Sequence, residues 1–531
     1  MTVVATLAHQ KLLVRPGMHT CKALICTLLL ALTPSLLADQ QVSRERLRGD
    51  LEFLSSPALE GRASLGRGAE TTAWFLAAEM RKAGLQPAAG SGYLQPFDVM
   101  PIRLDREQSE VRIARNGAER SFTPRAVFFP EPAQPIDLRL PVAFAGYGIT
   151  APEFGYDDYA GLDVQRKAVL IFDHEPQEDD PDSIFHGTGF TLHASTWTKT
   201  WNAERHGAAA VLIVTEPVNT HRAAPRPPDR ADAPPQGLAR SELRIPRVTL
   251  SLDVAEALLE GTGRTPAEWQ TRIDQRPAPA SQVLEGVRVQ LKAVNAESGV
   301  QASYNVAGLL PGSDPALRDQ TILVTAHYDH LGVQNGKLYP GANDNASGVA
   351  AMLEVARLLA ARPPARSVLF LAFGSEEQLM LGSYHYVSHP LRPLATTQAV
   401  LNLDMIGRPE EHTPESLGAY ELTATRSNQL NLVGAVFHPG LHSVLEREAA
   451  RLEIDLSTKF DRDSSMRALF RCDHLPFLQK GLPAVWVFGG FHPGYHEPAD
   501  TVDRLDLDKI ATAVRLTVSS VRALAQEANT R

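Results

Sequence analysis

The second half of the chain, from residue 286 onward, alternates short apolar runs with amphipathic segments. The apolar runs predict strands that are buried on both faces, as in a parallel sheet: Thr321–Ala326, Ser367–Phe373, Ala399–Leu403 and Leu482–Phe488. Two further segments, Ala346–Ala361 and Leu507–Ala523, have apolar residues at helical spacing and predict helices. This alternation indicates an α/β fold with a mostly parallel sheet covered by helices.

The first half of the chain has a different pattern. Residues 43–86 predict helical structure, most clearly in Thr71–Lys82, and Gly84 supplies a helix stop. Between Pro141 and Pro277, short strand-like runs are separated by polar, proline-rich loops. This middle region predicts a mostly β module inserted into the α/β domain.

The N-terminus predicts export. Lys22 precedes the apolar run Ala23–Leu32, and the small residue Ala38 ends the segment. This arrangement is typical of a cleaved secretory signal peptide over residues 1–38, with Met18 as an alternative start. We therefore expect a secreted or periplasmic protein of the bacterial cell envelope, without stable membrane association after cleavage.

Cysteine content and charge exclude several classes of protein. Of the three cysteines, Cys21 and Cys26 lie in the signal segment, which leaves Cys472 to the mature protein. A disulfide scaffold and a thiolate zinc site both need more cysteines than this. The formal net charge of −9 argues against a nucleic-acid partner, because phosphate binding needs a basic surface.

Polar side chains gather where the predicted strands end. Acidic residues and histidines follow all four strands, and one acidic residue precedes the first predicted helix: His327, Asp329, Glu376, Glu377, Asp404, His492, His496 and Asp344. In parallel sheets, sites form at the carboxyl ends of the strands. Carboxylates and imidazoles without thiolates suit zinc, manganese or cobalt, with zinc the usual ion.

Charge balance predicts a pair of metal ions. Two dications are neutralised by Asp344, Glu377, Asp404 and one bridging hydroxide. A single zinc would leave too much negative charge packed together. A carboxylate can bridge ions about 3.5–4 Å apart, and we assign that role to Asp344.

The adjacent residues Glu376 and Glu377 predict a division of labour. Neighbouring side chains in an extended segment point apart, so one can bind metal while the other faces the water. Glu376 is then the general base, which takes a proton from water and passes it to the leaving amine. Asp329 would accept a hydrogen bond from the far ring nitrogen of His327.

Five segments together resemble the co-catalytic zinc aminopeptidase family, which includes aminopeptidase Y and bacterial leucyl aminopeptidases and is related to glutamate carboxypeptidase: TAHYDHLG, GANDNASGVAAMLE, FGSEEQLMLGS, LNLDMIGR and YHEPADT. The resemblance implies a three-layer α/β/α sandwich and two Zn²⁺ ions per chain. Two middle segments, FAGYGITAPEFGYDDYAGL and ERHGAAAVLIV, resemble the protease-associated domain inserted in such enzymes. The implied organisation is a signal peptide at 1–38, an N-terminal part of the peptidase at 39–140, a protease-associated insert at 141–280 and the catalytic domain at 281–531.

Carried over position by position, the resemblance implies that one metal is held by His327, Asp344 and Asp404. The other metal is held by Asp344, Glu377 and His496. His496 is favoured over His492 because it precedes the Pro498, Asp500 and Thr501 pattern. The chain departs from the family at Leu379, where a glycine is usual.

The implied activity is that of a metallo-aminopeptidase, which hydrolyses N-terminal residues from a peptide substrate through a metal-bridging hydroxide and a glutamate base. A carboxypeptidase or dipeptidase on the same scaffold stays open, because four arginines could bind a substrate carboxylate: Arg408, Arg462, Arg467 and Arg471. A glutaminyl cyclase, which uses one zinc, and a non-catalytic binding protein are disfavoured because all the ligand positions are retained.

Overall fold

The computed structural model describes residues 41–122, 128–129, 135–219, 235–296, 299–414, 416 and 420–527. Arg44–Arg531 form one compact unit. The expected signal peptide at 1–38 lies outside the described residues. Among the described residues, no helix combines the length and the apolar composition that crossing a membrane requires.

The larger of the two main sheets carries the predicted strands. Its order is β11-β2-β14-β18-β15-β19-β22-β20-β21, with β1 beside β14. The strands are β11 (Gln236–Leu238), β2 (Leu94–Pro101), β14 (Gln301–Leu310), β18 (Ser367–Phe373), β15 (Thr321–His327), β19 (Thr397–Asp404), β22 (Ala484–Phe488), β20 (Gln429–Val433), β21 (Asp455–Ser457) and β1 (Gln86–Pro87). The central strands β18, β15, β19 and β22 are paired in parallel, whereas β14 and β20 flank them in antiparallel pairing.

The four apolar runs are confirmed as these central strands, and every residue in them is buried. A helix between two of these strands carries the chain back to the edge of the sheet at which the first strand began. The next strand therefore runs parallel to the first. The strand predicted from Leu482 begins at Ala484, since Pro483 has no N–H to donate to a neighbouring strand.

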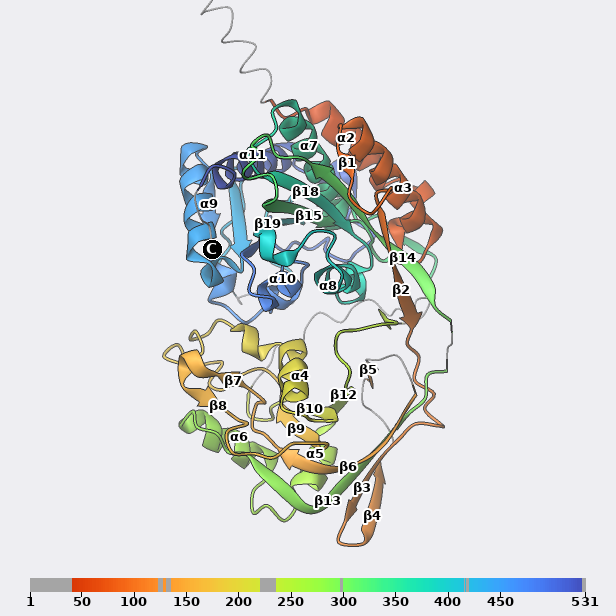
Figure 1. Cartoon of the computed structure of the whole chain (residues 1–531), viewed down its shortest axis with the longest axis vertical. Helices are drawn as coiled ribbons and strands as arrows, with labels where there is room; N and C mark the ends of the chain where they lie inside the picture. The colour runs from red at the N-terminus through yellow and green to blue at the C-terminus, as the bar shows by residue number, and fades with distance from the viewer. Residues whose placement is uncertain are drawn as a thin grey trace, which may run out of the picture. The chain divides into compact units, whose positions relative to one another are not determined.

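Helices lie on both faces of this sheet (Figure 1). On one face α7 (Gly348–Ala361) packs against β15, β19 and β18, and α11 (Leu507–Leu524) and α2 (Arg44–Leu54) pack against α7. On the other face α8 (Leu381–Ser388) contacts β14 and α10 (Leu475–Gln479) contacts β22. The mixed α/β fold is thereby confirmed.

Residues predicted to be helical near the N-terminus form α2, the 3-10 segment η1 (Pro57–Arg62) and α3 (Arg67–Lys82). Helix α11 begins at a capped end, because the carboxylate of Asp506 accepts hydrogen bonds from the N–H groups of Asp508 and Lys509. This cap and the apolar face of the helix explain why the sequence pattern located α11.

The second main sheet has the order β4-β3-β13-β6-β9-β10-β12-β5. Its strands are β3 (Glu110–Arg115), β4 (Ala118–Phe122), β5 (Phe128–Phe129), β6 (Ile136–Phe144), β9 (Ala168–Phe172), β10 (Ala210–Val214), β12 (Arg247–Leu250) and β13 (Gln282–Ala293). Strands β6, β9, β10 and β12 are parallel neighbours. The helices α4 (Thr196–Arg205), α5 (Leu252–Leu259) and α6 (Pro266–Gln275) accompany this sheet.

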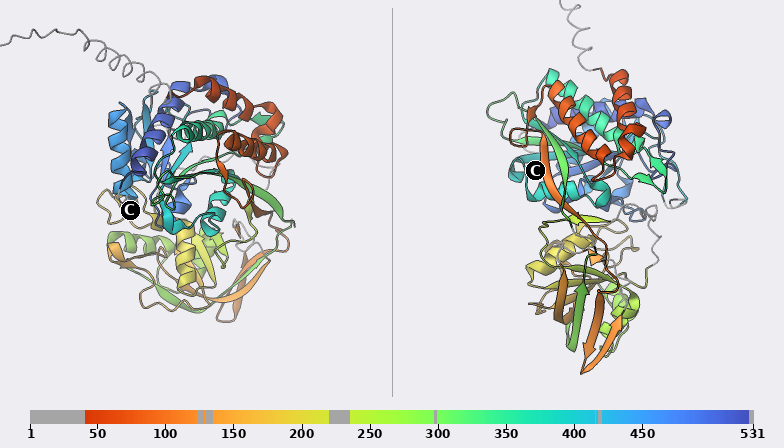
Figure 2. Two further views of the ribbon diagram at one scale, coloured as in Figure 1. Left: turned by 45° about the horizontal axis from the view of Figure 1, so that its top comes forward. Right: turned by 90° about the vertical axis from the view of Figure 1, so that its right-hand side faces the viewer.

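The second sheet extends further along the chain than the predicted insert at 141–280. Its outer strands β3 and β4 precede residue 141, and β13 runs on to Ala293. The right-hand view of Figure 2 shows the orange β3 and β4 beside the green β13. Conversely, β11 falls inside the predicted insert but pairs with β2 of the larger sheet. Local patterning indicated strand-like runs in the middle region, but it could not give the limits of the sheet or tell which sheet each strand joins.

Candidate functional site

The candidate site lies at the carboxyl edge of the parallel strands of the larger sheet. His327 is the last residue of β15, Asp404 is the last residue of β19, and Glu377 follows β18 by four residues. His496 comes from the loop after β22, and Asp344 lies in the π-helical turn η4 (Ala342–Ser347) before α7. Adjacent parallel strands end at the same edge, so side chains distant in sequence meet there.

Two histidines and three carboxylates converge with the spacing of a metal pair. The His327 Nε2 atom lies 3.3 Å from Asp344 Oδ1 and 3.3 Å from Asp404 Oδ1. The His496 Nε2 atom lies 3.1 Å from Asp344 Oδ2 and 3.4 Å from Glu377 Oε2. Ligands about 2.0–2.1 Å from a tetrahedral zinc ion are separated by about 3.3 Å. Two groups of side chains therefore have suitable dimensions: His327, Asp344 and Asp404 form one, and Asp344, Glu377 and His496 form the other.

Asp344 belongs to both groups, with one carboxylate oxygen directed at each histidine. A carboxylate shared in this way has the geometry of a bridge between two ions. The donor set contains only nitrogen and oxygen ligands, which agrees with the chemistry of zinc. The residues present therefore fit a zinc pair.

The structure gives Asp329 a different contact from the one expected. Its carboxylate Oδ1 lies 3.9 Å from His327 Nδ1, too far for a hydrogen bond, whereas its backbone carbonyl lies at 3.2 Å. The carboxylate instead accepts hydrogen bonds from the backbone N–H groups of Glu376 at 2.9 Å and Glu377 at 3.3 Å. Asp329 thus positions the two glutamates, while its backbone orients His327. The spacing of Asp329 and His327 in the sequence indicated that the two residues are close, but it could not show which oxygen of Asp329 contacts the ring.

Two residues near the site were not assigned from the sequence. His330 is buried, and its Nδ1 atom lies 2.8 Å from Glu377 Oε1, so it joins a group with Asp344 and Glu377. Arg62 is also buried and donates to the backbone carbonyls of Tyr328, Pro340 and Gly341, which ties the loops on either side of the site together. His330 stands in the segment TAHYDHLG, but neither strand-end position nor spacing distinguishes either residue in the sequence.

His492 lies close to the site without contacting the carboxylates of the two groups. It is buried, and its Nε2 atom is 2.8 Å from the Asn343 side-chain nitrogen. Burial lowers the pKa of His492 to about 3. The structure thus places His496, rather than His492, beside Asp344 and Glu377.

The two adjacent glutamates have opposite electrostatic environments. Burial, together with the carboxylates of Asp473 and Glu377, raises the pKa of Glu376 well above its usual value against the opposing effect of His327. Burial also acts on Glu377, but the neighbouring His496 and His330 hold the pKa of its carboxyl well below the usual range. The two side chains therefore differ in proton affinity, as a base and a metal ligand should.

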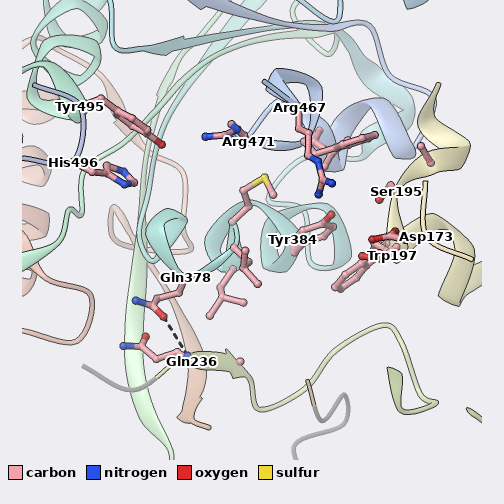
Figure 3. A pocket seen from close by; sticks show the side chains of 18 of the residues that line it. Asp173, Ser195, Trp197, Gln236, Gln378, Tyr384, Arg467, Arg471, Tyr495 and His496 are labelled. Carbon is pink, nitrogen blue, oxygen red and sulfur yellow. Dashed lines mark hydrogen bonds between the residues drawn. The ribbon is translucent and has the colours of Figure 1, made fainter. Parts of the chain in front are cut away.

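The site opens into two cavities that share part of their lining. The smaller, of about 170 Å³, contains the five convergent side chains and Glu376. The larger, of about 670 Å³, is lined by residues that include Tyr495, His496, Arg467 and Arg471 (Figure 3). Of the four arginines considered from the sequence, Arg467 and Arg471 line the larger cavity, whereas Arg408 is buried with its guanidinium 3.4 Å from Glu411 and Arg462 is exposed.

Leu379 lines both cavities and is 56% exposed. Its φ of +68° lies in the left-handed region that favours glycine. The leucine therefore adopts a backbone conformation in which a glycine would be less strained. It adds an apolar side chain to the cavity wall.

Comparisons with known proteins identify the family of this chain. Residues 305–521 match the model of the family described as Peptidase family M28. The chain is 28% identical over 333 residues to aminopeptidase YwaD of Bacillus subtilis, covering 61% of this chain and 59% of that protein. It is 31% identical over 249 residues to the uncharacterized protein YfbL of Escherichia coli, covering 44% of this chain and 74% of that protein.

A solved structure, the aminopeptidase from Aneurinibacillus sp. strain AM-1, is similar with a TM-score of 0.47 and 19% identity, covering 93% of this chain and 96% of that one. The chain spans less than two thirds of the length of YwaD, so the activity of that whole protein does not transfer directly. The family itself is shown by the matched family model and by the similarity to YfbL. The resemblance to the zinc aminopeptidase family is thereby confirmed, and the chain belongs to peptidase family M28, a family of zinc-dependent peptide hydrolases.

Proposed function

We propose that this chain is a two-zinc exopeptidase that removes N-terminal residues from peptides. The observation that carries the proposal is the carboxylate of Asp344, which directs one oxygen to His327 at 3.3 Å and the other to His496 at 3.1 Å. A single ion would not require one carboxylate to serve two histidines. The names of the relatives, aminopeptidase among them, support the exopeptidase class.

In this proposal, His327, Asp344 and Asp404 hold one ion, and Asp344, Glu377 and His496 hold the other. When bound, a zinc pair lowers the pKa of water and polarises the scissile carbonyl. The chain's own residues would fix where each ion sits, and the partly exposed His496, which lines both cavities, leaves this side open to substrate.

Glu376 is the proposed general base. Its carboxylate Oε2 lies 3.9 Å from His327 Nε2, beside the metal ligands but outside both groups. It would accept the proton of the attacking water and deliver that proton to the leaving amine. Asp329 holds the backbone of this glutamate in place through the 2.9 Å hydrogen bond from its N–H.

A dipeptidase or carboxypeptidase is the second candidate, and the two cavity arginines favour it. Arg467 and Arg471 form no ion pair within 4.0 Å with any carboxylate of the described residues. The Arg471 guanidinium lies 5.6 Å from the centre of the Phe491 ring instead. A cation so placed beside the metal ligands would suit a carboxylate of the substrate.

An assay with three substrates separates these activities. An aminoacyl-nitroanilide has a free amine and no carboxylate, an N-blocked peptide has only the carboxylate, and a dipeptide has both. We expect cleavage of the nitroanilide and no cleavage of the N-blocked peptide. Cleavage of the N-blocked peptide alone would replace the aminopeptidase proposal with the carboxypeptidase.

The remaining parts of the proposal concern the surroundings of the site. The larger sheet with its helices would form the three-layer sandwich of the family, and the second sheet would be the protease-associated domain. Export through the segment at 1–38 would place the enzyme in the cell envelope or outside the cell. Its partners would be peptides rather than nucleic acids.

A further inference from the structure

A second group of potential metal ligands lies in the smaller sheet, at the carboxyl ends of two adjacent parallel strands. His174 follows the end of β9 by two residues, and Glu216 follows the end of β10 by two residues. Strands β9 and β10 are paired in register from Ala168 and Ala210 onward, so their ends lie together. The loop after β9 adds Glu178. This is the same structural position that carries the ligands in the larger sheet.

The carboxylates of Glu178 and Glu216 both lie close to the same ring nitrogen of His174. The His174 Nδ1 atom lies 2.9 Å from Glu178 Oε2 and 2.5 Å from Glu216 Oε1. A ring nitrogen carries at most one hydrogen, so it can donate to only one of two carboxylates. Two carboxylate oxygens directed at one nitrogen indicate a shared positive centre, and all three ligand atoms lie within 4.8 Å of one another.

The three side chains of the cluster are buried. His174, Glu178 and Glu216 are only 3%, 5% and 1% exposed. Removing two carboxylates from water is unfavourable unless their charge is compensated locally. Burial lowers the pKa of His174, but the two glutamates raise it to about 9, so the carboxylates attract positive charge strongly.

Neighbouring polar side chains support the cluster. The Asn219 side chain donates to Glu178 Oε1 at 2.9 Å, and the Gln270 side chain donates in turn to Asn219 at 2.8 Å. The buried ammonium of Lys199 donates to the backbone carbonyls of Tyr147 and Phe172, and its charge also interacts with Glu216. Such support from outer residues is what orients the ligands of metal sites.

We propose that His174, Glu178 and Glu216 bind one divalent transition-metal ion, with zinc favoured by the donor set. One imidazole nitrogen and two carboxylate oxygens are ligands that zinc accepts, whereas calcium takes oxygen ligands. This site is independent of the proposed zinc pair, since it shares no residue with it.

The bound ion would stabilise a loop that forms part of the larger cavity. His174 and Asp173 line that cavity, and Asp173 is visible on its wall in Figure 3. Further along the same loop, the Thr188 hydroxyl donates to the Arg462 carbonyl at 2.8 Å, and the Ser464 N–H donates to the Thr188 carbonyl at 2.9 Å. The site would therefore affect substrate binding more than the chemical step.

Metal stoichiometry tests the proposal on the full-length protein. After equilibrium dialysis against Zn²⁺, the Glu216→Gln and His174→Gln variants are each expected to bind one zinc equivalent fewer than the wild type. Glu153→Gln is the matched control, because Glu153 contacts His193 at 2.7 Å in a histidine–glutamate pair that belongs to no ligand group. This control should bind as much zinc as the wild type.

The difference of one equivalent is independent of how many ions the peptidase centre holds. If Glu216→Gln folds with a normal circular dichroism spectrum and binds as much zinc as the wild type, the proposal is overturned. Should the cluster variants fail to fold, Asp344→Asn provides the second measurement, since it removes the shared ligand of the peptidase centre. That variant is expected to retain one zinc equivalent, and complete loss of zinc would overturn the proposal.

Discussion

The carboxylate of Asp500 holds the backbone of Asp344 in place. Its Oδ2 atom accepts a hydrogen bond from the Asp344 N–H at 3.0 Å, and its Oδ1 atom accepts one from the Asn343 N–H at 2.9 Å. Asp500 is fully buried and lies 156 positions along the chain from Asp344. The residue proposed to bridge two ions is thus oriented by a carboxylate from the far end of the domain.

Replacing Asp500 by asparagine is expected to weaken metal binding. The amide offers one acceptor oxygen, and its NH₂ group would face a backbone N–H that needs an acceptor. Loss of such a supporting contact typically costs about 10–100-fold in metal affinity or activity. Zinc affinity measured by competition with a chelator checks this. Asp503→Asn, at an exposed position in the next turn, is the control and should bind zinc like the wild type.

Glu376→Gln tests the division of labour between the two glutamates. The glutamine keeps the shape of the side chain but cannot accept the proton, so kcat should fall by about 10²–10⁴-fold. Both zinc equivalents should remain, because Glu376 stands outside the two ligand groups. A Gln variant that is inactive and also depleted of zinc would show that Glu376 is a ligand.

Arg471→Gln tests whether the cavity recognises a carboxylate. A charge-assisted hydrogen bond contributes about 1.5–3 kcal/mol, so KM for a dipeptide should rise about 10–100-fold relative to KM for the corresponding dipeptide amide. Arg462→Gln is the matched control, because Arg462 is exposed and does not line the larger cavity. Equal changes in KM for the two substrates would exclude carboxylate recognition by Arg471.

Leu379 can be tested by two substitutions that separate its backbone from its side chain. Both Leu379→Gly and Leu379→Ala remove the apolar side chain from the cavity, so both should raise KM for apolar substrates to a similar extent. Only glycine relieves the left-handed backbone at φ +68°, and we expect the glycine variant to be about 1 kcal/mol more stable than the alanine variant. Urea unfolding of the two variants measures this difference, and equal stability would mean that the backbone is not strained.

His474 makes the stability of the fold sensitive to acid. The ring is fully buried, and burial lowers its pKa from 6.5 to about 3. The unfolded chain takes up this proton near pH 6.5 and the folded chain resists it. The stabilising effect of the neutral ring is therefore complete above about pH 6.5 and is lost as the pH falls toward 3.

The His474→Asn variant should lack this component. Between pH 8 and pH 5 the wild type is expected to lose about 2 kcal/mol of unfolding free energy that the variant does not lose. Urea unfolding with a fixed excess of zinc measures both proteins, so that pH effects on metal binding are common to them. Parallel losses in the two proteins would contradict the prediction.

The sequence by itself determined the elements with strong periodicity and the types of ligand. The run Ser367–Phe373 is a strand with those same bounds, because seven consecutive buried residues leave no other arrangement for a short apolar segment. The positions of His327 and Asp404 at strand ends indicated which edge of the sheet carries the chemistry. These inferences succeed because a strand that is buried on both faces has a continuous apolar sequence, and the strand ends where polar residues begin.

The tertiary structure alone decided which side chains meet. It assigned β11 to the larger sheet, directed the Asp329 carboxylate to the backbone of Glu376 rather than to His327, and brought Asp500 to Asp344. It also assembled His174, Glu178 and Glu216, none of which stands out in the sequence. A periodic pattern shows on which side of its own helix or strand a residue lies. Contacts between distant elements depend instead on the order of the strands and the paths of the loops, which no local pattern encodes.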